Sequence, residues 1–246
     1  MTTWGKLNFE NNYFAIARGE VDGFSHLHRS GYNPQIDSNT DPETIWTGGG
    51  LYPWSEFNTP RTLYVQSTSA LESGTVTVYG LDSNFNQTQE VFEIVGTTTH
   101  VSSLTFSRVN GAFFTSPNSN LGDITVRVGS STGVVVSDIP IGFGVSLSTA
   151  YTVPFGKTAF IVSGNFTVQK GEGAQVQFLA RYFGDNFKIA HIAEAFQNTY
   201  RYDFNVPVML PAKSDLDVLV YQVVTNGTRV TANYDLILVD DHALHK

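Results

Sequence analysis

Polar and apolar residues alternate along most of this 246-residue chain, which is the pattern of half-buried β-strands. Clear examples are residues 62–67, 75–79 and 89–95, which are separated by residues that favour turns. Runs of the same kind recur at even spacing toward the C-terminus. This spacing predicts an all-β protein made of antiparallel sandwiches or jelly rolls, and it argues against alternating strand–helix units.

One segment fits two kinds of structure. Residues 188–197 contain good helix formers, but at period two Phe187, Ile189 and His191 share one face. The predicted strands on either side and the turn at 184–186 favour the extended form, so we expect a strand here.

The alternation stops at residues 138–145, where Pro140 and two glycines interrupt it. We expect a domain boundary at this point. The resulting division has an extended N-terminal arm over 1–60, a β-sandwich over 61–140 and a second, jelly-roll-like sandwich over 141–246.

The predicted arm is rich in glycine and aromatic residues but shows neither a helical period nor a long strand. Flexible linkers lack large aromatic side chains, and the aromatic area of this segment must be buried somewhere. An arm laid across its own surface or that of a neighbouring chain meets both conditions. The candidate interface residues are Trp4, Phe24, Trp46, Tyr52 and Trp54.

The amino-acid composition limits the kinds of partner and compartment that we expect for this chain. Charged residues make up only 15% of the chain and the net charge is −8, so binding to nucleic acid through phosphate neutralisation is not expected. The chain has no cysteine, which fits folding in a reducing cytoplasm. The opening residues lack an apolar core and the apolar runs are short, so we expect neither a signal peptide nor a membrane span.

The sequence gives only weak signals for catalytic or metal-binding sites. His26 and His28 share a face of an extended segment, but zinc needs three or four ligands and no third is near in sequence, so we expect a structural or interface role. Residues 240–245 contain ligand types, yet a frayed tail is expected there. Asp215 and Asp217 have the residue types of a glycosidase pair. We interpret them as the solvated face of a strand, and expect no catalytic residue, metal or cofactor.

Three motifs then carry a family resemblance: Gly19-Glu-Val-Asp-Gly23 with Ile45-Trp-Thr-Gly-Gly-Gly50, Val76-Thr-Val-Tyr-Gly-Leu-Asp82, and Tyr151-Thr-Val-Pro-Phe-Gly-Lys157. With them the chain resembles virion structural proteins of tailed bacteriophages, many of them marine. The resemblance implies a particle component without enzymatic activity, made in the host cytoplasm. Its implied partners are the major capsid protein or other virion proteins.

Among virion positions, we expect a capsid decoration or cement protein that forms homotrimers. A cement protein binds many identical lattice sites, and an aromatic arm with weakly charged β surfaces suits that task. A neck or head–tail connector, or a tail adaptor, is the first alternative. A carbohydrate- or receptor-binding module, with Trp4, Trp46 or Trp54 stacking on sugars, is the second.

Overall fold

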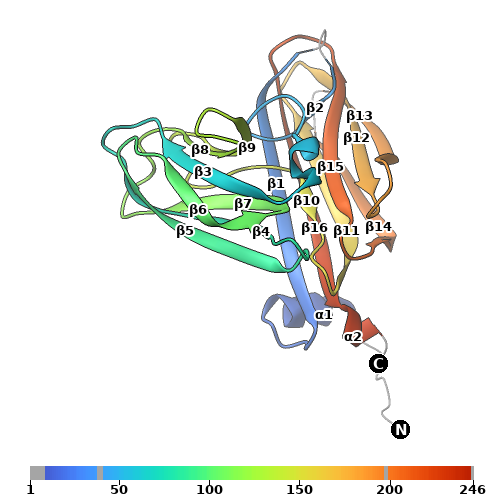
Figure 1. The fold of residues 1–246 in the computed structure, drawn as a ribbon. Helices are drawn as coiled ribbons and strands as arrows, with labels where there is room; N and C mark the ends of the chain where they lie inside the picture. Colours follow the sequence, from blue (N-terminus) through green and yellow to red (C-terminus); the bar gives the residue numbers. More distant parts are fainter. Residues whose placement is uncertain (1–8, 38–40, 197–198, 245–246) are drawn as a thin grey trace.

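The alternating sequence forms antiparallel strands in a computed structural model that describes residues 9–37, 41–196 and 199–244 (Figure 1). The strands build a larger and a smaller sandwich, which confirms the predicted all-β class. The larger sandwich contains β1 (Phe24–Ile36), β2 (Glu43–Thr44), β10 (Tyr151–Thr152), β11 (Lys157–Val168), β12 (Gly173–Arg181), β13 (Lys188–Phe196), β14 (Thr199–Leu210), β15 (Asp215–Val223) and β16 (Thr228–Asp240).

The larger sandwich has jelly-roll strand order. One sheet runs β1-β16-β11-β14 and is called here the β16 sheet. The other runs β10-β15-β12-β13, with β2 also paired to β15, and is called the β12 sheet. Counting β1 and then β10 to β16 as strands one to eight, the sheets read 1-8-3-6 and 2-7-4-5. Two interlocked Greek keys of this kind define the jelly roll.

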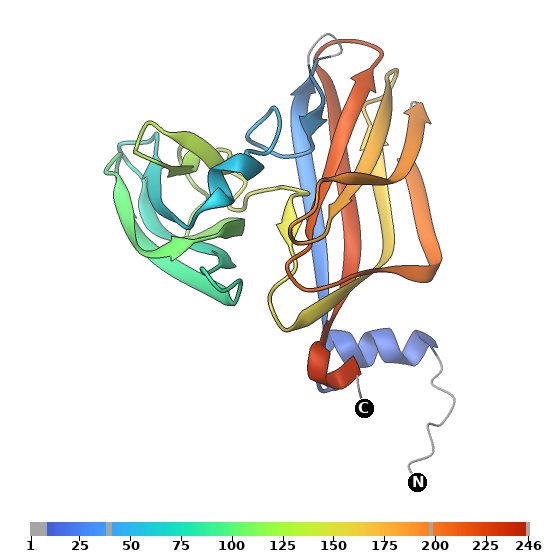
Figure 2. The same cartoon turned by 45° about the vertical axis from the view of Figure 1, so that its right-hand side comes forward.

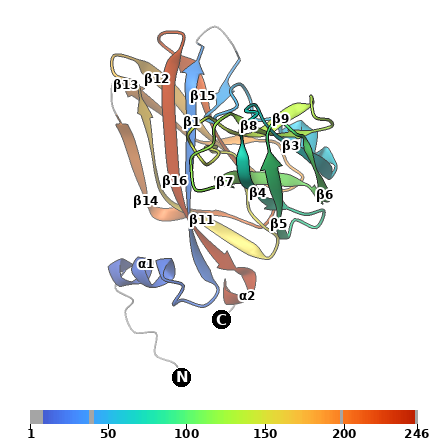
Figure 3. The ribbon, with the colours of Figure 1, turned by 90° about the vertical axis from the view of Figure 1, so that its left-hand side faces the viewer.

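The smaller sandwich is inserted between the first and second strands of this jelly roll. Its sheets run β6-β3-β8-β9 and β5-β4-β7. Figures 2 and 3 show it to one side of the larger sandwich. Its strands are β3 (Arg61–Ser67), β4 (Ser73–Leu81), β5 (Gln87–Val95), β6 (His100–Phe106), β7 (Arg108–Thr115), β8 (Ile124–Val128) and β9 (Val134–Ile139).

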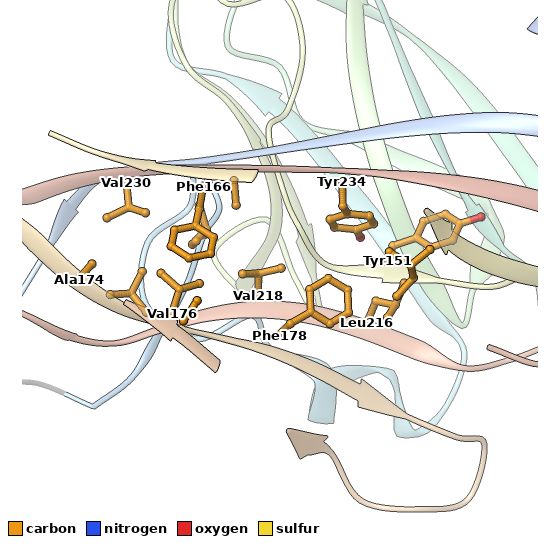
Figure 4. Packing of buried hydrophobic residues seen from close by; sticks show 14 of the residues in the cluster. Tyr151, Phe166, Ala174, Val176, Phe178, Leu216, Val218, Val230 and Tyr234 are labelled. Atoms are coloured by element: carbon orange, nitrogen blue, oxygen red, sulfur yellow. The ribbon is translucent and has the colours of Figure 1, made fainter. Parts of the chain in front are cut away.

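Each sandwich has its own hydrophobic core. In the larger one, apolar side chains from the two facing sheets interdigitate, and the rings of Phe178 and Tyr234 meet edge to face at 5.6 Å (Figure 4). Val176 and Val218 fill the space beside them. Burying one such aliphatic side chain stabilises a fold by about 2 kcal/mol, so these cores supply the main driving force.

The segment predicted as an arm is different in the structure. Within 1–60, residues 24–36 form β1, which pairs with β16 from Phe24 to Ile36 and completes the jelly roll. Its alternation is hidden because the buried positions hold Arg29, Gly31 and Asn33 in place of aliphatic residues. Gly31 is required here, because a Cβ would collide with the carbonyl oxygen of Ile45.

Short helices complete the described chain. Helix α1 (Phe9–Ala17) ends at Gly19, whose φ of +72° suits the left-handed position that closes a helix. The 3-10 helix η1 (Trp54–Asn58) leads into β3, and α2 (Asp241–Leu244) follows β16. Helices α1 and α2 lie at the same end of the larger sandwich (Figure 1). Residues 188–196 form β13, as the extended interpretation predicts.

Candidate functional site

The two sandwiches meet at a buried polar joint, defined by Thr44, Trp54, Arg108, Asp215 and Asp217. Nε of Arg108, from β7, donates to Oδ1 of Asp215 on β15 at 2.9 Å, and a terminal nitrogen donates to Oδ2 at 3.1 Å. Arg181 approaches the same carboxylate from β12, with Nε 2.8 Å from Oδ2. Two guanidinium groups therefore neutralise one buried carboxylate, as such a group requires.

Asp217 supplies the second carboxyl group of the joint, and only one of its two oxygens accepts hydrogen bonds from the residues that the structure describes. Oδ2 of Asp217 accepts hydrogen bonds from Nε1 of Trp54 at 2.9 Å and from Oγ1 of Thr44 at 3.0 Å. Oδ1 has no hydrogen-bond partner in the described part of the chain. Burial raises the pKa of Asp217 to about 6, although the hydrogen bonds from Trp54 and Thr44 oppose this shift. This carboxyl group therefore changes its charge close to neutral pH.

These positions correct the interpretation of Asp215 and Asp217 as a solvated strand face. Each is 2% exposed. β15 is covered on one face by the jelly-roll core and on the other by the smaller sandwich and the segment leading into it. Polar residues at period two indicated a water-facing surface. In the structure Asp215 instead pairs with Arg108 of the smaller sandwich, and Asp217 accepts hydrogen bonds from Trp54 and Thr44.

Three of the five predicted interface aromatics, Trp46, Tyr52 and Trp54, lie near the joint and pack inside the chain. Trp46 is 3% and Tyr52 is 4% exposed, both in the core of the smaller sandwich. Trp54 is half-buried, and its ring lies edge to face with Tyr52 at 4.7 Å. Their apolar area is thus buried by their own domain, so Trp46 and Tyr52 are not free to anchor another chain or stack on a sugar. Phe24 is half-buried at the start of β1, and Trp4 lies outside the described residues.

His26 and His28 converge on one carboxylate that sequence spacing could not reveal. Nε2 of His26 and Nδ1 of His28 lie 3.0 and 2.8 Å from Oδ1 of Asp235, which β16 brings opposite β1. Ser163 donates to Oδ2 at 3.0 Å. Partial burial raises the pKa of Asp235, but hydrogen bonds from His28, His26 and Ser163 outweigh it and hold the pKa below its usual range.

This cluster has the connectivity of a serine–histidine–carboxylate relay, since Oγ of Ser30 lies 3.2 Å from Nε2 of His28. The hydroxyl of Ser30, however, donates to Oδ1 of Asn233. Its proton is therefore directed away from the imidazole that would have to accept it during nucleophilic attack. The arrangement fixes side chains on a surface and does not activate Ser30.

The described residues contain no group of three or more His, Cys, Asp or Glu side chains arranged to hold a metal ion. At the C-terminal end, the expectation of a frayed tail from residue 240 is wrong as far as Leu244. Asp240 pairs with Lys157, and Asp241 accepts a hydrogen bond from Oγ1 of Thr158 at 2.9 Å. These bonds hold the end of β16 and the start of α2 against the first residues of β11.

A further surface escaped the sequence analysis. β13 and β14 are the end strands of the two jelly-roll sheets and lie on the side away from the smaller sandwich (Figures 1 and 3). Five large hydrophobic residues on them are exposed, and they define what we call the open side: Ile189, Ile192, Phe196, Val206 and Met209. Alternation predicted these strands but not which sheet edge would remain uncovered.

No helix in the described ranges is both long and apolar enough to cross a bilayer. No protein-family model matches the chain, and no curated protein matches it significantly.

Solved structures give only distant likenesses. The PBSX exported protein XepA is 8% identical, with 86% of this chain and 84% of that chain covered and a TM-score of 0.21. The VP2 subviral particle of infectious bursal disease virus is 8% identical, with coverage of 90% and 73% and a TM-score of 0.23. The structure of the Gx strain of that virus is 10% identical, with coverage of 88% and 72% and a TM-score of 0.24. Likenesses at these scores carry no functional argument.

Proposed function

We propose that this chain is a non-enzymatic structural protein of a tailed-bacteriophage particle, a capsid decoration or cement protein that assembles through its open side. The observation that carries the proposal is the exposed hydrophobic surface on β13 and β14. Val206 is 81% exposed and Phe196 is 66% exposed. Exposed apolar side chains on two end strands of one sandwich favour a protein–protein contact, because their removal from water is favourable.

The strand edges strengthen this argument. Among the described strands, β14 pairs with β11 alone and β13 with β12 alone, so within this part of the chain each presents an unpaired backbone edge near the apolar side chains. Proteins usually protect such edges, since they pair readily with another chain. Coverage by a further copy would bury both the hydrophobic side chains and the edge.

Two considerations connect this surface to a virion. The sequence motifs resemble those of phage virion structural proteins, and a jelly roll is an architecture used by viral capsid domains. The second point is an analogy at the level of fold. A threefold lattice site would select a trimer, which is the oligomer we propose.

Light scattering coupled to size exclusion tests the oligomer. The wild-type protein should elute with the mass of a trimer, and the double variant Ile192→Glu/Val206→Glu should be a monomer with an unchanged circular dichroism spectrum. The matched control is Val95→Glu on β5, which is 67% exposed but lies on the smaller sandwich. It should remain a trimer, whereas a monomeric wild-type protein would contradict the proposed assembly.

Quantitative mass spectrometry of purified particles tests the location. A copy number that matches the capsid lattice, with earlier DNA release on heating of particles that lack the protein, supports the cement role. A ring-sized copy number, with normal heads that fail to attach tails, would identify a neck or adaptor protein instead.

A further inference from the structure

A groove separates α1 from the outer face of the β16 sheet, and β14 is the strand that it shares with the open side. Its volume is about 520 Å³, within the range of small-ligand pockets. Helix α1 lines it with Tyr13, Phe14 and Ala17. The sheet lines it with His26, Val162, Ser163, Arg201, Asp203, Phe204, Asp235 and Ile237.

The sheet wall holds fixed polar groups. Asp235 is oriented by His26, His28 and Ser163, so its carboxylate oxygens keep one position. Arg201 and Asp203 add an exposed ion pair beside it, in which Nε of Arg201 donates to Oδ2 of Asp203 at 3.1 Å. A carboxylate held as Asp235 is binds a ligand without losing much conformational freedom.

The opposite wall, formed by α1, carries two exposed aromatic side chains. Phe14 is 70% exposed and Tyr13 is 46% exposed, so helix α1 presents two rings that its own chain does not cover. A ligand in the groove can therefore stack on an apolar ring on one side and form hydrogen bonds with the polar side chains of the sheet on the other.

The polar surface continues beyond the groove along the same face. The next rank of side chains is linked across three strands, because Ser30 donates to Asn233 and Nδ2 of Asn233 donates to Asn165 at 3.2 Å. In the following rank, the hydroxyls of Thr167 and Thr199 are 2.8 Å apart. This ladder would contact an elongated ligand that leaves the groove.

We propose that this groove binds a neutral oligosaccharide. A pyranose ring has an apolar face that stacks on an aromatic side chain, and its hydroxyls both donate and accept, matching the mixed Arg201, Asp203 and Asp235 wall. A peptide strand fits less well, because β16 and β11 already use their backbone groups on both sides. An anion is disfavoured because Asp203 neutralises Arg201 and Asp235 adds a negative charge.

Saturation-transfer NMR on the full-length protein tests the proposal, with maltotriose, mannotriose, galactotriose and chitotriose as probes. At least one should receive saturation from the protein. Tyr13→Ala and Arg201→Ala should each weaken that binding about tenfold, which corresponds to 1.4 kcal/mol.

Two matched controls separate the groove from general surface effects. Phe183→Ala removes an aromatic ring of similar exposure, 62%, and Asp185→Asn breaks the exposed pair with Lys188. Both should bind the sugar as the wild type does. Absence of saturation transfer with all four sugars, or binding that Tyr13→Ala and Arg201→Ala leave unchanged, would overturn the saccharide site. A change in oligomeric mass for Tyr13→Ala without sugar binding would assign the groove to a contact between copies. The open side is tested by the oligomeric mass of the wild type and of Ile192→Glu/Val206→Glu without sugar, so the two proposals can fail separately.

Discussion

Arg108 and Asp215 form the ion pair that fixes the smaller sandwich against the jelly roll. They are 107 residues apart in the sequence, and two hydrogen bonds join the guanidinium to the carboxylate. Only 10% of the Arg108 side chain and 3% of the Asp215 side chain are exposed. The pair therefore lies in a poorly hydrated region, where the loss of Arg108 leaves Asp215 with Arg181 as its one arginine partner and lowers the stability of the fold.

Arg108→Ala should lower the free energy of unfolding by about 3 kcal/mol, because it removes one of the two arginines at Asp215. Urea denaturation followed by tryptophan fluorescence measures this change. Lys188→Ala, which breaks an exposed pair with Asp185, should cost well under about 1 kcal/mol. Equal effects of the two substitutions would show that the joint pair does not stabilise the fold.

The proton affinity of Asp217 predicts a pH dependence. Its folded pKa of about 6 lies above the ordinary 3.8 of an aspartate, so between these pH values the folded state binds more protons than the unfolded state. Stability contributed by this group is therefore complete below pH 3.8 and is lost as pH rises through 6, by a few kcal/mol in total.

Asp217→Asn keeps an oxygen acceptor for Trp54 and Thr44 but cannot ionise. The difference in unfolding free energy between the wild type and this variant should shift in favour of the variant from pH 4 to pH 7. Urea titrations at stepped pH values provide the comparison. A difference that is constant across this range would mean that Asp217 binds its proton equally in the folded and unfolded states, so that folding does not raise its pKa.

Trp46→Ala should damage folding and not docking, because the ring is buried in the smaller sandwich. We expect a loss of about 3 to 5 kcal/mol, as for other large-to-small core changes. Leu51→Ala is the nearby control, since Leu51 is 53% exposed, and it should change stability little. A Trp46→Ala protein with wild-type stability but defective assembly would restore the interface role predicted from the sequence.

Two N-terminal deletions test the contributions of α1 and β1 to folding separately. Removing residues 1–22 should leave the far-UV circular dichroism spectrum and cooperative unfolding intact, because the deletion spares every described strand. Removing residues 1–37 should abolish cooperative unfolding of the larger sandwich, since it deletes the first jelly-roll strand and its buried Arg29, Asn33 and Ile36. A folded, cooperative product of the longer deletion would show that β1 is dispensable.

The strands were predictable because alternation is a local signal, and it identified β3, β4, β5 and the extended form of β13 directly. β1 was not predictable in this way, because three of its buried positions hold Arg29, Gly31 and Asn33, which break the alternation of polar and apolar residues. The joint was misread for the same reason. Asp215 has the alternation of a surface residue, and only the position of Arg108 in space shows that it is buried. The cluster at Asp235 likewise joins residues more than 200 positions apart.

The place of the smaller sandwich within the jelly roll has a consequence for how such a chain can diversify. The outgoing and returning segments are bridged at Trp46 and Ser148, so both junctions of the inserted domain lie close together. Domains whose ends lie close together tolerate insertion into loops, because they leave the host core undisturbed. The jelly roll can therefore stay constant while the inserted domain is exchanged for another with a complementary arginine, which would change the surface of the protein without changing its larger sandwich.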